Sequence, residues 1–215
     1  MEQAFWQERW TTRQIGFHQP HPNELLLAHA SLFDGLQRIY VPLCGKSTDL
    51  AFLRRRGHVV VGSEFVGQAI AELFGELGET PVTARAGPFR THAVPQLTIL
   101  EGDALLVEPD HAGGQVDGIY DRAALVAVAP ADRVRLVASY RRLLRLGGRL
   151  LVIVFDYDQS RLKGPPWAVS SDEVARLFGD FGRIRLLGER TESPSERFAA
   201  AGVNEFIEQA WAVET

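Results

Sequence analysis

The sequence predicts a doubly wound α/β fold, in which a mostly parallel sheet carries helices on both faces. Short runs rich in Val, Ile and Leu alternate with segments of helical periodicity, the pattern of strand–helix–strand units. Residues 150–155 are almost purely apolar, as expected for a central strand that is covered on both faces. The last two predicted strands have no helix between them, which indicates an antiparallel hairpin at one edge of the sheet.

The elements follow one another along a single domain that spans residues 1–215. Residues 1–35 are expected to form an N-terminal helical arm, because they are rich in aromatic residues, His and Asn and differ in texture from the rest. The predicted strands are 38–42, 58–62, 97–100, 116–120, 150–155, 184–187 and 206–213. The predicted helices are 48–56, 68–77, 130–144 and 171–178, and residues 79–95 form an insert that contains Pro and Gly.

Two of these helices carry recognisable end signals. Gly147 and Gly148 are expected to cap and turn the helix over 130–144. Ser170 or Ser171 is expected to cap the helix over 171–178, with Glu173 in the first turn, where the helix dipole favours a negative charge.

The composition argues against several kinds of partner. The chain has 215 residues, 46% of them hydrophobic, and a net charge of −4, so it lacks the basic surface that binding to nucleic acid or to an anionic membrane requires. The single cysteine, Cys44, excludes an internal disulfide and a cysteine-rich metal site. No run approaches the roughly 18 apolar residues of a membrane span, and residues 1–10 do not form a signal peptide. We therefore expect a cytoplasmic monomer.

Two residues at the ends of the first two strands are candidates for binding a nucleoside. Gly45 follows the first strand, where the absence of a side chain lets the backbone approach a ligand. The turn matches neither G-x-G-x-x-G nor a phosphate-binding loop, and an ordinary tight turn is the alternative. Glu64 ends the second strand, where α/β nucleotide-binding folds place the acid that accepts bonds from ribose hydroxyls. The alternative is an exposed acid at a strand end.

Further candidates follow the third and fourth strands. Asp103 could meet the amino group of an adenine ring flanked by Ala104, although an ordinary turn Asp is the alternative. Arg122, next to Asp121, could pair with a carboxylate of the cofactor or with an acidic group of the substrate. A structural role for the Asp121–Arg122 pair is the alternative.

The aromatic residues of the arm allow two interpretations. Trp6 and Trp10 are four residues apart, which is typical of a helical face that packs on the core. An aromatic ring on an arm can also stack on a sulfonium or a flat ligand. His18 and His21 lack acidic or cysteine neighbours, so a metal site is not expected.

Taken together, these motifs resemble the thiopurine S-methyltransferase family over nearly the whole chain. The resemblance is carried by Trp6 and Trp10 and by residues 16–19 (GFHQ), 42–47 (PLCGKS), 57–64 (GHVVVGSE), 120–127 (YDRAALVA) and 164–166 (GPP). It implies a class I methyltransferase fold with seven strands in the order 3-2-1-4-5-7-6, and S-adenosyl-L-methionine as cofactor. Bacterial members are associated with detoxification of tellurium and selenium compounds as well as methylation of aromatic thiols.

The resemblance also implies a set of site residues. The cofactor-binding residues would be Trp10, Leu43, Gly45, Glu64, Asp103, Ala104 and Arg122. The substrate would contact Phe17 and Arg197, under an arm that acts as a lid. Two positions depart from the family pattern: residues 65–67 lack the usual Ser after the ribose acid, and Trp167 stands where Phe is usual.

The chemistry implied is transfer of a methyl group to the sulfur of a small aromatic or heterocyclic thiol. Such thiols are more acidic than cysteine, with its reference pKa of about 8.5, so no obligatory general base is expected. The rate would come from alignment of the reacting atoms and from exclusion of water. A class I methyltransferase acting on thiocyanate, halide or another small nucleophile stays an alternative, as does a non-catalytic adenosyl-binding protein.

Overall fold

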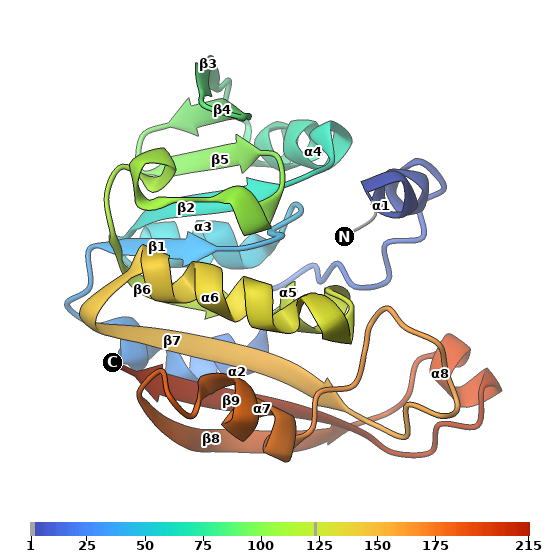
Figure 1. Ribbon diagram of the computed structural model, residues 1–215. Helices are drawn as coiled ribbons and strands as arrows, with labels where there is room; N and C mark the ends of the chain where they lie inside the picture. The colour runs from blue at the N-terminus through green and yellow to red at the C-terminus, as the bar shows by residue number, and fades with distance from the viewer. Residues whose placement is uncertain (1–2, 123) are drawn as a thin grey trace.

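The computed structural model describes residues 3–122 and 124–215, which form one nine-stranded sheet with helices on both faces (Figure 1). Residues 1–2 of the predicted arm and Ala123 of the 120–127 motif lie outside the described residues. The strand order is β3-β4-β5-β2-β1-β6-β7-β9-β8. Without β3 and β4 this is the order 3-2-1-4-5-7-6, so the predicted seven-stranded topology is confirmed.

Five parallel strands form the centre of the sheet. They are β5 (Leu97–Glu101), β2 (Val59–Glu64), β1 (Arg38–Val41), β6 (Val116–Asp121) and β7 (Leu144–Asp156). The strands β9 (Phe206–Glu214) and β8 (Arg183–Glu192) continue the sheet in antiparallel sense beyond β7, as the missing helix between them predicted. A short helix, α8 (Glu196–Ala200), does lie in their connection.

The insert over residues 79–95 contains two strands that the sequence did not reveal. The strands β3 (Val82–Ala86) and β4 (Phe89–Val94) form an antiparallel hairpin that extends the sheet beyond β5. Gly87 turns the hairpin with a positive φ of 56°. The Pro and Gly residues that made this segment look irregular lie at its ends and in this turn.

Helices on the two faces enclose two separate cores. One face carries α2 (Glu24–His29), α3 (Thr48–Arg55) and α4 (Gly67–Leu77). The other carries α5 (Ala124–Ala127), α6 (Arg133–Leu143) and α7 (Ser171–Phe178). Figure 1 shows α5, α6 and α7 in front of the sheet and α3 behind it. Short 3₁₀ turns complete the fold at Ala30–Phe33, Ala104–Leu106, Pro109–Ala112 and Pro130–Asp132.

The predicted helix ends had different outcomes. Ser170 caps α7 by accepting a hydrogen bond from the backbone N–H of Glu173 at 3.3 Å, as predicted. The prediction that Gly147 and Gly148 end the preceding helix was wrong, because α6 ends at Leu143 and both glycines lie within β7. Leu144 already has extended backbone angles and begins the strand. No helix among the described residues is long and apolar enough to cross a membrane.

The arm lies at the edge of the sheet where the parallel strands end. Its helix α1 (Gln3–Thr11) stands beside the end towards which the arrowheads of β1, β2 and β5 point in Figure 1. Ligands of doubly wound sheets bind outside the carboxyl ends of the strands, where the strand order reverses. The fold therefore places the arm over the edge at which a ligand is expected.

Candidate functional site

A cavity of about 560 Å³ opens at the carboxyl ends of β1, β2 and β6. Its size lies in the range typical of small-molecule sites, about 300–1,000 Å³. The arm, the turn after β1 and the segment around α8 all contribute to its walls. Seven of the residues predicted for the site line it: Trp10, Phe17, Leu43, Gly45, Glu64, Arg122 and Arg197.

The turn after β1 lies tightly against the neighbouring strand β2. Leu43 and Gly45 both have positive φ angles, 46° and 52°. The backbone N–H of Cys44 donates to the carbonyl of Ser63 at 2.9 Å. A Cβ atom at Gly62 would lie 2.8 Å from the Cys44 sulfur, so only glycine at this position of β2 allows the turn to come so close. The turn thus places Gly45 at the cavity wall, where the Trp10 ring lies 3.2 Å from the position a Cβ atom would take.

Glu64 links this turn to the start of α4. Its Oε2 accepts a hydrogen bond from the backbone N–H of Gly45, and its Oε1 accepts one from that of Val66, both at 2.8 Å. Burial raises the pKa of the Glu64 carboxyl, and the bonds from the backbone lower it by less. A carboxylate offers about four acceptor positions, so Glu64 can still accept hydrogen bonds from a ligand in the cavity.

Asp103 and Ala104 are not among the residues that line the cavity. Asp103 caps the 3₁₀ turn Ala104–Leu106, accepting a hydrogen bond from the backbone N–H of Leu105 at 3.0 Å. Ala104 is buried. In the structure Asp103 thus has a local capping role, which agrees with the alternative of an ordinary turn Asp.

The arm is held on the body of the protein through α4. Trp10 is buried against Val66 and Ala69, and its ring lies 6.0 Å from that of Phe17. Arg13 forms an ion pair with Glu72 of α4 at 2.9 Å. Trp10 thus combines the packing role and the position beside the cavity that the sequence analysis had treated as alternatives.

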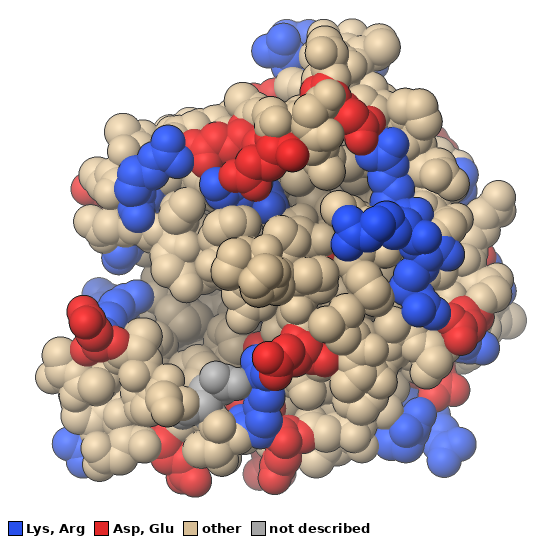
Figure 2. Space-filling model, turned by 180° about the vertical axis from the view of Figure 1, so that it is seen from behind, with Lys and Arg blue, Asp and Glu red and all other residues tan. Residues whose placement is uncertain are grey.

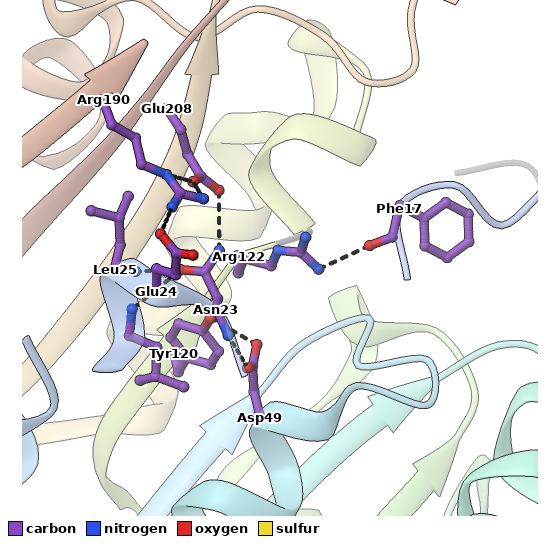
Figure 3. A network of polar contacts seen from close by, with 10 residues as sticks. Phe17, Asn23, Glu24, Leu25, Asp49, Tyr120, Arg122, Arg190 and Glu208 are labelled. Atoms are coloured by element: carbon purple, nitrogen blue, oxygen red, sulfur yellow. Dashed lines mark hydrogen bonds and ion pairs between the residues drawn. The ribbon is translucent and has the colours of Figure 1, made fainter. Parts of the chain in front are cut away.

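A network of polar side chains lies on the other side of the cavity (Figure 3). Asp49 accepts hydrogen bonds from the backbone N–H of Asn23 at 2.8 Å and from the Tyr120 hydroxyl at 2.9 Å. The amide of Asn23 donates to Glu208 at 3.2 Å, and Arg190 forms an ion pair with Glu208 at 2.7 Å. This network joins the base of the arm to the sheet.

Sequence reasoning singled out Tyr120 only as part of the 120–127 motif, and it missed Asp49, Glu208 and Arg190. Asp49 is indistinguishable in sequence from any acid in the first turn of a helix, where the dipole favours it. Glu208 lies inside a predicted strand, and an acid within a mostly apolar strand was the one available signal.

Arg122 extends from the end of β6 towards the arm. Its guanidinium donates to the backbone carbonyl of Phe17 at 3.0 Å. Its Nε atom is buried and has no hydrogen-bond partner among the described residues. A buried N–H without a partner is costly, so this atom marks a place where a ligand acceptor fits.

Aromatic rings form the part of the cavity nearest to α8. Phe206 lies 4.9 Å from Phe155 and 5.0 Å from Phe198, measured between ring centroids. Arg197 donates to the carbonyl of Pro165 at 3.0 Å and also lines the cavity. Trp167, which departs from the family pattern, does not line it. This region can accept a flat apolar ligand.

Acidic and basic side chains are mixed on the surface. Figure 2 shows acidic side chains close to basic ones on one face of the molecule. Pairs such as Arg54 with Glu79, at 2.6 Å, compensate one another. No group of three or more His, Cys, Asp or Glu side chains could hold a metal ion in the part of the chain that the structure describes.

Comparison with known proteins gives a match over the full length. The profile of the family "Thiopurine S-methyltransferase" covers residues 1–215. Curated relatives with that name include proteins from Pseudomonas fluorescens, 39% identical over 215 residues and covering 98% of both chains, and from Methylococcus capsulatus, 39% identical over 215 residues with 98% and 96% covered.

Solved structures share the fold at low sequence identity. A 1,6-didemethyltoxoflavin-N1-methyltransferase from Burkholderia thailandensis has a TM-score of 0.65 at 16% identity, with 99% of this chain and 87% of that chain covered. A SAM-dependent methyltransferase from Anabaena variabilis also has a TM-score of 0.65 at 16% identity, with 99% and 95% covered. These similarities show the class I methyltransferase fold.

Proposed function

The chain belongs to the thiopurine S-methyltransferase family, and on this premise we propose that it methylates the sulfur of aromatic or heterocyclic thiols, and selenium or tellurium compounds as well. The methyl donor is S-adenosyl-L-methionine. The observation that carries the proposal is the family match over all 215 residues.

The cofactor would lie against the turn after β1. Glu64 would accept hydrogen bonds from the ribose hydroxyls, and Gly45 and Leu43 would let the backbone approach the methionyl tail. Trp10 would close the site from the arm, and Arg122, at the end of β6, would bind an anionic group of the cofactor. Asp103 and Ala104, which do not line the cavity, would reach the adenine only from its rim. The buried unpartnered Nε of Arg122 supports the fit of an anionic ligand group here.

The thiol would occupy the aromatic region near α8. Phe17 from the arm and Arg197 from α8 would contact it. Arg197 bonds to the carbonyl of Pro165, and no acid pairs with it among the described residues. Its charge is therefore available to attract an acceptor in thiolate form.

The chemistry requires little proton transfer by the protein. When bound, S-adenosyl-L-methionine supplies an electrophilic methyl group. The acceptor sulfur, ionised in solution, would form the new carbon–sulfur bond as the bond between the methyl carbon and the cofactor sulfur breaks, and the electron pair of that bond would stay on the cofactor sulfur. The chain contributes by aligning the two sulfurs and by closing the arm to exclude water. We further propose that residues 1–215 form one domain that works as a cytoplasmic monomer.

The test combines binding and transfer assays. Calorimetry should show that the purified protein binds S-adenosylhomocysteine, and labelled cofactor should transfer its methyl group to 6-mercaptopurine and thiophenol, with selenite and tellurite assayed beside them. Transfer to thiocyanate or iodide without transfer to thiols would favour the alternative methyltransferase. Binding without transfer to any acceptor would favour a non-catalytic adenosyl-binding protein.

A further inference from the structure

A buried acid beside the predicted cofactor turn has no role in the function described so far. Asp49 lines the cavity although only 2% of its surface is exposed. Its two hydrogen-bond donors, the backbone N–H of Asn23 and the Tyr120 hydroxyl, are both neutral. No cation pairs with it among residues 3–122 and 124–215. Burying a carboxylate without a cation is unfavourable, so this site is suited to a positively charged ligand group.

The other buried acid of the network differs in this respect. Glu208 also lines the cavity, but Arg190 binds it through both Nε, at 2.8 Å, and a terminal nitrogen, at 2.7 Å. Its negative charge is therefore compensated within the protein. Of these two acids, Asp49 is the one whose charge is left for a ligand.

A cation without an acidic partner borders the same cavity. Arg122 forms no ion pair among the described residues, and its Nε is buried and unpartnered. Asp49 and Arg122 both lie close to Tyr120, and their charges act on it in opposite directions, while burial raises the pKa of the Tyr120 hydroxyl. Figure 3 shows the three side chains in one close-up. A negative and a positive group around one aromatic ring match a ligand that carries an ammonium and a carboxylate on the same carbon atom.

We propose that Asp49 binds the α-ammonium group of the methionyl tail of S-adenosyl-L-methionine, and that Arg122 binds its carboxylate. The proposal rests on the function given above and adds the residue that recognises the amino group. Pairing an ammonium with a buried carboxylate forms a charge-assisted hydrogen bond and compensates the charge of Asp49. Asp49 would thus distinguish the complete cofactor from adenosine compounds that lack the amino acid.

The test compares three ligands on the full-length protein by calorimetry. They are S-adenosylhomocysteine, its deaminated analogue, in which hydrogen replaces the α-amino group, and 5′-methylthioadenosine, which lacks the whole amino acid. Asp49→Asn removes the charge with little change in shape. We expect Asp49→Asn to lower the affinity for S-adenosylhomocysteine by about tenfold or more, the scale of a lost hydrogen bond to a charged group. The affinities for the two other ligands should fall by less than about threefold.

A control variant separates a specific effect of Asp49 from a general effect of the substitution. Asp117→Asn makes the same chemical change outside the cavity, where Asp117 accepts hydrogen bonds from the backbone of Gln37 and Arg38 at the start of β1. It should bind all three ligands like the parent protein.

The results that overturn the proposal are distinct from those that overturn the function. If Asp49→Asn loses affinity equally for all three ligands, or loses none, the role of Asp49 is purely structural. Should this variant not fold, the parent protein decides, because a preference of less than about threefold for S-adenosylhomocysteine over the deaminated analogue contradicts the proposal. Failure of the parent protein to bind any of the three overturns the proposed function and the inference with it.

Discussion

At the residue scale, the Glu64 carboxylate holds two backbone segments and, in the proposed function, would also bind the cofactor. Its oxygens fix the backbone of Gly45 and of Val66, which shapes the turn after β1 and the start of α4. In the proposed function the remaining acceptor positions would bind the ribose hydroxyls. A change at Glu64 should therefore affect both the shape of the cavity and the bonds to the ligand.

Glu64→Gln should raise the dissociation constant of S-adenosylhomocysteine by about tenfold or more, because a charge-assisted acceptor is replaced by a neutral amide of the same size. Calorimetry on the two proteins measures the change. Glu214→Gln, at the exposed end of β9, is the matched control and should leave binding unaltered. An unchanged constant in Glu64→Gln would remove Glu64 from the cofactor site.

Two glycines should respond in opposite directions to the same substitution. A Cβ atom at Gly62 would lie 2.7 Å from the Ile99 Cδ1 atom, whereas at Gly75, within α4, no atom lies within 4 Å. Gly62→Ala should lower the free energy of unfolding by about 1–3 kcal/mol through overpacking. Gly75→Ala should raise it by about 0.5–1 kcal/mol through helix propensity. Urea unfolding of both variants tests this, and a stable Gly62→Ala protein would show that the turn can move.

The residues that could be identified from sequence are those whose role follows from a strand end. Gly45, Glu64 and Arg122 each follow or close a strand, and all three line one cavity. Asp49 could not be identified, because its burial depends on Tyr120, 71 residues further along the chain. Local sequence contains no trace of such a contact.

At the element scale, the first part of the arm, residues 3–20, is held in position by a few contacts. It rests on α4 through Trp10 and through the ion pair of Arg13 with Glu72. The arm's own helix α1 has no continuous apolar face and buries only Trp10. Its ordering therefore depends on docking rather than on its own stability.

Removal of residues 1–20 should abolish most methyl transfer while leaving the sheet folded. The deletion takes away Trp10 and Phe17, which line the cavity, but none of the residues of the two large cores. Circular dichroism checks the fold, and turnover with labelled cofactor checks activity. Full activity in the truncated protein would exclude a lid role for the arm.

The docking of the arm should weaken in acid. Burial, with the charges of Lys46 and Arg122, lowers the pKa of His18 below 6.5, although Glu72 and Glu76 act in the opposite direction. A histidine whose folded pKa is lowered favours the docked state fully above the unfolded pKa, and this contribution is lost as the pH falls. We expect faster proteolysis of the arm at about pH 5.5 than at about pH 7.5, and a smaller difference in His18→Gln. Equal rates at both pH values would exclude His18 as the cause.

Elements with a strong periodic signal were predicted, and those set by tertiary pairing were not. Leu150 and its neighbours in β7 are apolar because both faces are covered, so the strand was evident. The strand β3 has mostly exposed side chains and exists because β4 pairs with it, so it left no apolar pattern to detect. The start of β7 at Leu144 is likewise set by pairing, here with Val116 of β6. The sequence pattern therefore assigned Leu144 to the preceding helix.

At the scale of the whole molecule, the sheet makes its two cores one cooperative unit. The same strands contribute to both: Ile119 faces one core and Tyr120 the other, and Leu150 and Leu151 divide in the same way. Helices on either face therefore share a common sheet, and neither face can unfold alone without exposing the strands beneath it. This arrangement supports the proposal of a single domain.

Heating should consequently unfold the protein in one transition, and bound ligand should raise the midpoint temperature of that transition. S-adenosylhomocysteine at 100 times its dissociation constant should add about 2.7 kcal/mol, which raises Tm by roughly 5–10 °C in a chain of this length. Differential scanning calorimetry with and without ligand gives both results. The protein lacking residues 1–20 should also unfold in one step but gain less from the ligand, because it has lost Trp10 from the cavity wall. Two separate transitions in the full chain would contradict the single domain, and an equal ligand shift in the truncated protein would place the arm outside the binding site.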